Sequence, residues 1–350
     1  MRRDLLDLMQ LRTTAKWGFF MSLDMAAALW YRETALRTKP GSRNTYITAY
    51  MYMASDHIGS VRIRKITPGL IEDLYHRLRS RGSTSSALAG LHAALCSIFS
   101  HATSRGVISH NPMTQVNTQT LKKPGIRELP EKTPPQFMEY VKNKNPQTYL
   151  ILFLLLNTGL RVGELGGLLW DCVDLEKGYI HVRRNLLKLD KRITGFPLAL
   201  CSPKSSSSIR RIPLGDDLWN MLAEYKEKPR NHVPPVPVID DSGVITGYES
   251  DFVFATQRRG PITRNALQKR LRRVVNSYCE NVDPDMQYFN IHSIRHMFAT
   301  NVYEVVQDPK LLSSLLGHKS VRTTLDIYTH LTEDSERRMR DLVNRLGERE

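Results

Sequence analysis

Cysteine is scarce in this sequence, and the few that occur are widely separated. The four thiols form no Cys-x-x-Cys pair, so they indicate neither a disulfide framework nor a zinc knuckle, and they suit a reducing cytoplasm. Long apolar runs are missing as well, because the longest, 149–156, is much shorter than the roughly 20 residues that cross a bilayer. The N-terminus lacks the apolar stretch of a signal peptide. We therefore expect a cytoplasmic protein without membrane contact.

Acidic side chains are outnumbered by basic ones. The chain of 350 residues has 50 Lys plus Arg against 35 Asp plus Glu, a formal charge of +15. About half of this excess lies in residues 1–113, with 15 basic and 7 acidic side chains. Such a balance favours a polyanionic partner, because each phosphate contact releases bound counterions. A basic protein without a nucleic-acid partner is also compatible with the charge alone.

The first part of the chain has the periodicity of a helical bundle. Thr67 and Pro68 form a helix start, with a capping hydroxyl followed by proline in the first turn. Apolar side chains then repeat at helical spacing in two stripes: Leu70, Ile71, Leu74 and Leu78, and Leu88, Leu91, Leu95 and Ile98. We expect an N-terminal extension over 1–22 and a small helical bundle over 23–113, whose helices could lie along DNA.

A polar stretch without periodicity, 114–132, predicts a linker to a second domain over 133–332. This domain mixes helices with strands near 179–183 and 209–214, which predicts a small antiparallel sheet in a mainly helical fold. The proline-rich stretch 226–249 is expected to be a surface excursion. Residues 333–350 are expected to form a C-terminal helix.

A helix beginning at Thr263 has an apolar face formed by Leu267, Leu271, Val274 and Val275. Its remaining faces are rich in cations. The candidates for DNA contact are these cations and one arginine of the first domain: Lys269, Arg270, Arg272, Arg273 and Arg43. A solvated charged face is an equally good reading of this helix.

Three segments carry the chemistry. Residues 158–165 read Thr-Gly-Leu-Arg-Val-Gly-Glu-Leu, which places Glu164 three residues after Arg161, where it can orient the guanidinium. Alone this is weak, since Arg-x-x-Glu is a common helical ion pair. Residues 292–296 read His-Ser-Ile-Arg-His, so that His292, Arg295 and His296 share one helix face. A metal pair at the two histidines is the rival reading, but no third ligand is evident.

The third segment lies near the C-terminus, where Leu-Leu-Gly-His ends at His318 and Thr-Thr-Leu-Asp-Ile-Tyr-Thr-His contains Tyr328. Taken with the two segments above, in this order, these motifs closely resemble the signatures of the tyrosine recombinase, or phage integrase, family. The resemblance covers residues 22–336 and is strongest in the second domain.

The resemblance implies a role for each motif residue. Arg161 and Arg295 resemble the pair that clamps the scissile phosphate, for which planar guanidinium groups are suited. Tyr328 resembles the nucleophile, which forms a 3′-phosphotyrosyl bond with neither a metal ion nor a cofactor. His292 resembles the residue that accepts the tyrosine proton, and His318 a hydrogen-bond donor to the phosphate.

Two positioning roles and one acid complete the set. Glu164 resembles a residue that orients the first arginine, whereas His296 is expected to be structural. Lys204, in a serine-rich turn, resembles the hairpin lysine that protonates the departing 5′ oxygen. A plain solvent-exposed lysine is the alternative for that position.

The family also implies a fold and partners. We expect a two-domain, C-shaped clamp around double-stranded DNA, in which the helical bundle over 23–113 is the core-binding domain. Four copies of the chain are expected to form a homotetramer that passes through a Holliday junction. Accessory factors are expected to set the direction of the reaction, and the protein is expected at the bacterial nucleoid in the cytoplasm. The C-terminal helix docks either on a neighbouring protomer or on its own chain. Many integrases carry an arm-binding domain ahead of the helical one; here about 20 residues precede it, so either arm sites are not used or the chain is shortened.

The favoured function is integration and excision of a mobile element, and a Xer-like resolvase of chromosome or plasmid dimers is a close variant. A type IB topoisomerase-like enzyme would use the same chemistry to relax supercoils. A DNA-binding regulator that has lost catalysis comes from a different class, but every catalytic position is occupied.

Overall fold

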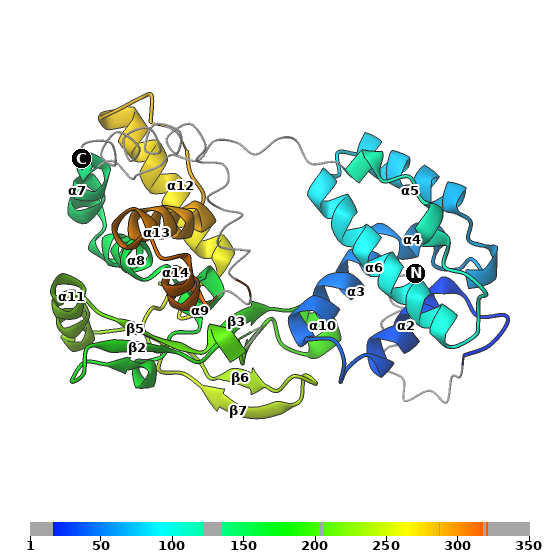
Figure 1. Cartoon of the computed structure of the whole chain (residues 1–350), viewed down its shortest axis with the longest axis horizontal. Helices are drawn as coiled ribbons and strands as arrows, with labels where there is room; N and C mark the ends of the chain where they lie inside the picture. Colours follow the sequence, from blue (N-terminus) through cyan, green and yellow to red (C-terminus); the bar gives the residue numbers. More distant parts are fainter. Residues whose placement is uncertain (1–16, 122–134, 204–205, 287, 318–319, 321–350) are drawn as a thin grey trace, which may run out of the picture. The chain divides into compact units, whose positions relative to one another are not determined.

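The computed structural model describes residues 17–121, 135–203, 206–286, 288–317 and 320. These residues form two compact units, which we treat separately (Figure 1). The first unit contains residues up to 127 together with 187–201 and 237–248. The second contains the rest. The domain boundaries expected from the sequence stay a prediction.

Five α-helices build most of the first unit: α2 (Leu23–Glu33), α3 (Pro40–Met53), α4 (Ser55–Ile58), α5 (Pro68–Ser80) and α6 (Ser85–Ser104). The predicted helix start at Thr67 is confirmed, because its hydroxyl accepts a hydrogen bond from the backbone amide of Leu70. Thr84 caps α6 in the same way and accepts from the backbone amide of Ala87. The two apolar stripes face a common core around the fully buried Trp30 and Tyr50, although Leu70 is only partly buried. Short 3₁₀ turns at Pro112–Gln115 and Gln119–Leu121 follow.

The stretch 226–249, expected to be a surface excursion, contains two strands that were not predicted. These are β6 (Val236–Ile239) and β7 (Ile245–Glu249), and they join β3 (Asn185–Lys188) and β4 (Leu198–Cys201) in a sheet of order β3-β4-β6-β7. The pairing of β4 with β6 is parallel, so this second sheet is not wholly antiparallel. These strands were not predicted because the stretch is rich in prolines and polar residues, which are more typical of loops.

The turn between β6 and β7 is anchored on α3. Lys39 forms an ion pair with Asp241 at 2.8 Å, and Arg43 donates from Nη2 to the carbonyl of Ser242, also at 2.8 Å. A further short helix, α10 (Lys191–Thr194), precedes β4. Asn44 of α3 also accepts a hydrogen bond from the backbone amide of Asp190. Helix α3 therefore holds both the β3–β4 connection and the β6–β7 turn.

The second unit is mainly helical with a three-stranded antiparallel sheet, as predicted. The sheet has the order β1-β2-β5, from Val173–Asp174, Tyr179–Val182 and Arg210–Pro213. Its register pairs Ile180 with Ile212, which turns both towards the core. The α-helices that the described residues of this unit form are α7 (Pro135–Lys144), α8 (Pro146–Thr158), α9 (Val162–Gly166), α11 (Asp216–Glu227), α12 (Arg264–Asn281), α13 (Ile291–Val306) and α14 (Pro309–Leu316).

The apolar run 149–156 forms the core of α8, as expected. Helix α8 packs against α7, α11 and α13, and α13 packs against α12 and α14 (Figure 1). No helix among the described residues is long and apolar enough to cross a membrane. The central position of α8 brings the motif that follows it next to α13, where the second motif lies.

Candidate active site

Gly159 makes the turn that brings the first two motifs together. It ends α8 with a φ of 58°, a left-handed conformation that favours glycine. A Cβ atom at this position would lie 2.3 Å from Cδ1 of Phe298 on α13. A side chain here would therefore prevent the close approach of the α8–α9 turn to α13, which places Arg161 beside the helix that carries Arg295.

Arg161 stands at the N-terminus of α9, where Glu164 holds it at two points. The Arg161 backbone amide donates to Glu164 Oε2 at 2.9 Å, and its Nη1 donates to Oε1 at 2.7 Å. Its Nη2 donates to the carbonyl of Gly317 at 2.9 Å. The side chain is nevertheless 36% exposed, whereas that of Glu164 is 2% exposed. Arg161 is thus oriented by a buried carboxylate and still accessible to a ligand.

Arg295 is buried and bound by backbone carbonyls on two sides. Its Nη1 donates to the carbonyl of Gly159 at 2.5 Å and its Nη2 to that of Leu316 at 2.6 Å. Burial, followed by the positive charge of Arg161, lowers the pKa of the Arg295 guanidinium to about 9, so that it stays protonated at neutral pH. The pKa is lowered although Glu164 lies nearby, so positive charge is in excess around Arg295, and this favours an anionic ligand such as a phosphate.

A third arginine, which sequence reasoning missed as a site residue, completes the group. Arg210 lies on β5 and donates to both oxygens of Glu164, from Nη2 at 2.9 Å and from Nη1 at 3.2 Å. The available signal was its position two residues before the buried Ile212, because residues i and i+2 of a strand share a face.

The C-terminal end of α14 is the point where the three arginines converge. Three successive carbonyls accept from three different guanidinium groups: Leu315 from Arg210, Leu316 from Arg295 and Gly317 from Arg161. The last carbonyls of a helix have no partner within the helix and carry its negative dipole end, so cations bind them well. These three residues are the Leu-Leu-Gly of the third motif, and His318 follows them directly.

His292 and His296 lie on α13 one turn apart, as predicted, with ring centroids 5.0 Å from each other. Partial loss of solvent, followed by the charges of His296 and Arg295, lowers the pKa of His292 below its ordinary value. An imidazole with a lowered pKa is neutral at pH 7 and can accept a proton. His292 is exposed, whereas His296 is only partly exposed.

Three predicted site residues, Lys204, His318 and Tyr328, lie outside the described residues. Their described neighbours on the chain nevertheless meet. The hydroxyl of Ser208 donates to the carbonyl of Gly317 at 3.4 Å, and a Cβ at Gly317 would lie 3.0 Å from the carbonyl oxygen of Ser207. The segment that follows Lys204 therefore contacts the residue that precedes His318.

The five candidates for DNA contact differ in their surroundings. Lys269, Arg272 and Arg273 are exposed on α12. Arg270 is partly buried and donates to the side-chain carbonyl of Gln147 at 2.9 Å. Arg43 is 7% exposed, and its guanidinium lies 4.8 Å from the ring centroid of Tyr31. We therefore no longer assign a DNA contact to Arg43, since its charged group already has protein partners.

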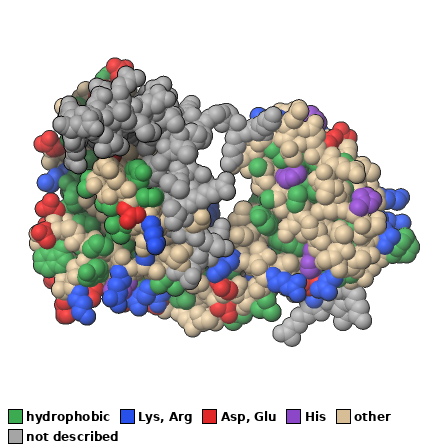
Figure 2. All heavy atoms as spheres, in the orientation of Figure 1, with side chains coloured by type: hydrophobic (Ala, Val, Ile, Leu, Met, Phe, Trp, Pro, Cys, Tyr) green, Lys and Arg blue, Asp and Glu red, His purple; other side chains and the backbone are tan. Residues whose placement is uncertain are grey.

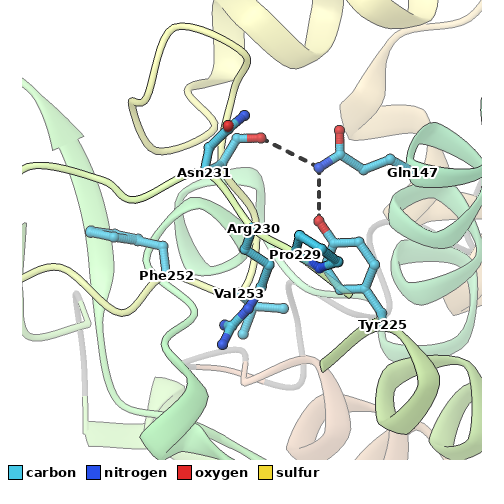
Figure 3. A pocket seen from close by; sticks show the side chains of 8 residues that line it. Gln147, Tyr225, Pro229, Arg230, Asn231, Phe252 and Val253 are labelled. Atoms are coloured by element: carbon cyan, nitrogen blue, oxygen red, sulfur yellow. Dashed lines mark hydrogen bonds between the residues drawn. The ribbon is translucent and has the colours of Figure 1, made fainter. Parts of the chain in front are cut away.

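Basic side chains on the face shown in Figure 2 are spread over both units, with acidic ones among them. No group of three or more His, Cys, Asp or Glu that could hold a metal ion occurs within the described ranges. A hollow of about 100 Å³ in the second unit is lined by Gln147, Tyr225 and Arg230, among others (Figure 3). The Gln147 amide donates to the Tyr225 hydroxyl at 2.8 Å, so the polar groups of this hollow serve the packing of α8 on α11.

Comparison with known proteins decides the family. The profile of the phage integrase family matches residues 127–335, more than half of the chain. The chain belongs to the phage integrase family. The expectation of a tyrosine-type site-specific DNA recombinase is thereby confirmed at the level of the family and its enzyme class.

Two curated relatives illustrate the range of this family. A tyrosine recombinase XerC-like protein of Caldanaerobacter subterraneus subsp. tengcongensis is 26% identical over 306 residues, 84% of this chain and 75% of the relative. The ICEBs1 integrase of Bacillus subtilis is 24% identical over 316 residues, 87% of this chain and 79% of the relative. Among solved structures, the Tn1549 transposon integrase in complex with a circular intermediate DNA has the same fold, with a TM-score of 0.73 and 22% identity over 92% of this chain and 99% of the other.

Proposed function

We propose that this member of the integrase family integrates and excises a mobile element by cutting and rejoining DNA strands at specific sites. The observation that carries the proposal is the convergence of Arg161 and Arg295 at the end of α14, with a histidine of lowered pKa, His292, on the same face of α13 as Arg295. Two cations beside a neutral base are what transesterification of a phosphodiester requires.

The reaction would proceed in two balanced steps. The Tyr328 phenol oxygen attacks the scissile phosphorus and forms a 3′-phosphotyrosyl bond, while the bond from phosphorus to the 5′ oxygen breaks. The phenol proton passes to His292, and Lys204 supplies a proton to the departing 5′ oxygen. The 5′ hydroxyl of a second strand then reverses the sequence, so the phosphodiester bond is conserved and no energy-rich cofactor is consumed.

The two arginines would act on the phosphate. A planar guanidinium donates to two oxygens at once, and in a site that excludes water it stabilises the charge that develops on the non-bridging oxygens. His318 is proposed to donate a further hydrogen bond. Because Arg161 and Arg295 are fixed by Glu164 and by backbone carbonyls, their positions require little reorganisation when the phosphate binds.

The proposed partner is double-stranded DNA. We propose that four protomers bring two sites together, that accessory factors set direction, and that the protein acts at the nucleoid in the cytoplasm. The apolar positions Met339, Leu342, Val343 and Leu346 recur at helical spacing, which suits a C-terminal helix that docks on a neighbouring protomer.

Similarity to a XerC-like recombinase keeps dimer resolution as the second candidate function. The two functions share their chemistry and differ in the DNA sites that are joined. The transposases of the transposons Tn916 and Tn1545 and the ICEBs1 integrase match shares of the chain similar to that of the XerC-like protein. The recurrence of transposon proteins and an integrase among the relatives favours integration and excision of a mobile element over dimer resolution.

The test begins with a pool of nicked duplexes with randomised sequence around the nick, which trap a covalent enzyme-DNA adduct. Sequencing of the trapped DNA identifies the site, and peptide mapping identifies the attached residue. We expect adducts at Tyr328 with the wild-type protein and none with Tyr328→Phe. Absence of any adduct would reject the proposal and favour a DNA-binding regulator. Equal adducts with both proteins would reject Tyr328 as the nucleophile and with it the proposed mechanism.

Two marked copies of the identified site on one plasmid then distinguish recombination from relaxation. A recombinant product supports the integrase or resolvase, and relaxation without a recombinant supports a type IB topoisomerase-like enzyme. Comparison of the recovered sequence with the ends of the element that carries the gene, or with chromosomal dimer sites, separates the two recombinases.

A further inference from the structure

Arg210 is nearly as buried as Arg295, with a side chain that is only 6% exposed, but more of its N–H groups are directed at protein acceptors. It donates from Nε to the carbonyl of Leu315 at 2.7 Å, from Nη1 to Ser208 at 3.1 Å, and from both Nη atoms to Glu164. A guanidinium has five N–H groups, so these bonds occupy most of its capacity. Arg210 is therefore unsuited to binding a phosphate itself.

Glu164 is shared between two arginines whose environments differ. Its 2% exposed carboxylate makes a two-point pair with Arg210 and a one-point pair with Arg161 through the side chain. Burial alone would raise the pKa of Glu164, but the hydrogen bonds and charge of Arg210, followed by the charge of Arg161, hold it below its ordinary value. Glu164 thus stays ionised, and Arg210 supplies most of the compensating charge.

We propose that Arg210 is a positioning residue of the strand-exchange site, which neutralises Glu164 so that the charge of Arg161 is available to the scissile phosphate. Without Arg210, the buried carboxylate would have Arg161 as its remaining ion-pair partner among the described residues, and the two would pair more closely. Arg161 would then be partly withdrawn from the ligand. This inference rests on the proposed function.

A second consequence concerns the chain around the site. Arg210 links β5, α9 and the end of α14 through one guanidinium, because Leu315 accepts from the same group that pairs with Glu164. The turn that contains Lys204 leads into β5, and the third motif begins in the last turn of α14. Arg210 therefore fixes the described ends of two segments that carry proposed catalytic residues.

The experiment compares Arg210→Met, Arg210→Lys and a matched control, Arg211→Met, on the DNA site recovered with the wild-type protein. Arg211 is the neighbouring arginine on the same strand, but it is exposed. We expect Arg210→Met to bind the duplex with nearly wild-type affinity and to form the covalent adduct about 10- to 100-fold more slowly, as is typical when a residue that orients a functional group is removed. Arg211→Met should cleave at the wild-type rate.

A duplex with an uncharged methylphosphonate at the scissile position separates a role in charge from a structural role. A residue that only maintains the fold should slow adduct formation equally on this duplex and on the ordinary one. If Arg210 acts through the charge of Arg161, the deficits of Arg210→Met and Arg161→Ala should both shrink several-fold on this substrate. The loss of rate in the double variant Arg161→Ala/Arg210→Met should also be close to that of Arg161→Ala alone, because the effects of residues that act through one another are not additive.

An equal deficit of Arg210→Met on both substrates, or a wild-type rate, would overturn the inference, whereas the proposed function fails only if the wild-type protein forms no adduct at Tyr328. Circular dichroism melting monitors folding. If Arg210→Met does not fold, the comparison passes to Arg210→Lys and to the double variant Glu164→Gln/Arg210→Met, which removes both buried charges. Because Arg210 is proposed to act by neutralising Glu164, its removal should have no further effect once that carboxylate is gone. A double variant that cleaves markedly more slowly than Glu164→Gln alone would therefore reject the inference, as would an Arg210→Lys variant with an equal deficit on both substrates.

Discussion

Arg295 and Leu316 are joined by a 2.6 Å hydrogen bond from Nη2 to the backbone carbonyl, across 21 residues of sequence. The bond connects a buried guanidinium on α13 to the last turn of α14. It ties an arginine that is proposed to bind the phosphate to the first residues of the third motif. The second bond of Arg295, to Gly159, extends the connection to the α8–α9 turn.

Arg295→Lys should impair both stability and catalysis, because one ammonium group cannot replace a planar guanidinium that donates to two carbonyls. We expect the free energy of unfolding to fall by about 1–3 kcal/mol, as for a lost hydrogen bond with a buried partner. The rate of adduct formation should fall about 100-fold or more, as for loss of a donor to a developing charge. Urea unfolding and single-turnover trapping measure the two effects. Arg273→Lys on exposed α12 is the control, and a wild-type rate for Arg295→Lys would contradict its assignment to the phosphate.

The rate of adduct formation should decline at acidic pH because His292 becomes protonated there. Because its pKa is lowered, the ring is neutral at pH 7 and becomes protonated only as the pH falls below its unperturbed value of about 6.5. Adduct formation should therefore be constant near pH 7 and decline at lower pH. His292→Ala should be slow and should lack this decline; if it keeps the same decline, another group is responsible.

The same shift has a consequence for stability. A folded state with a lowered histidine pKa binds fewer protons than the unfolded chain, so its contribution to stability is lost as the pH falls through the window below about 6.5. Melting at each pH separates this effect from loss of the base.

Gly159→Ala should destabilise the second unit. The substitution places a Cβ at a φ of 58° and only 2.3 Å from Phe298 Cδ1, so backbone strain adds to a clash. We expect a loss of about 2–4 kcal/mol in the free energy of unfolding. Gly178→Ala is the matched control, because Gly178 has a φ of 70° with nothing within 4 Å of the added carbon. Equal losses in the two variants would show that the contact with α13 contributes nothing.

Arg273 and Arg43 should behave differently in DNA binding. Removal of an exposed arginine that contacts a phosphate lowers affinity and reduces the slope of log K against log salt by about 1. We expect this of Arg273→Ala, as measured by fluorescence anisotropy at several salt concentrations. Arg43→Ala should leave the slope unchanged and lower stability by about 1–3 kcal/mol, because its charged group bonds to Ser242 and is buried. The reverse pattern would restore Arg43 as a DNA contact.

Chelation of divalent ions should leave adduct formation unchanged, because the proposed chemistry uses arginines in place of a metal ion. The measurement is single-turnover trapping in buffer with excess EDTA against buffer with Mg²⁺. Loss of adducts in EDTA, restored by added Mg²⁺, would contradict this mechanism.

The sequence alone determined the helix starts, the strands 179–183 and 209–214, and the family, because each depends on local signals. A capping hydroxyl, an apolar period and a motif of a few residues are all readable within one segment. The same locality predicted that Arg161 and Glu164 pair and that His292 and Arg295 share a helix. The order of the four motifs then implied one site.

Only the tertiary structure decided which groups meet across the chain. Nothing local to Arg210 indicates that it meets Glu164, 46 residues earlier, nor that Arg43 is enclosed by a turn near Ser242. The strands of 226–249 were missed for the same reason, since a strand is stabilised by its neighbours in the sheet and not by its own residues. Long-range pairing of charges with backbone carbonyls thus completed the site that the local motifs had outlined.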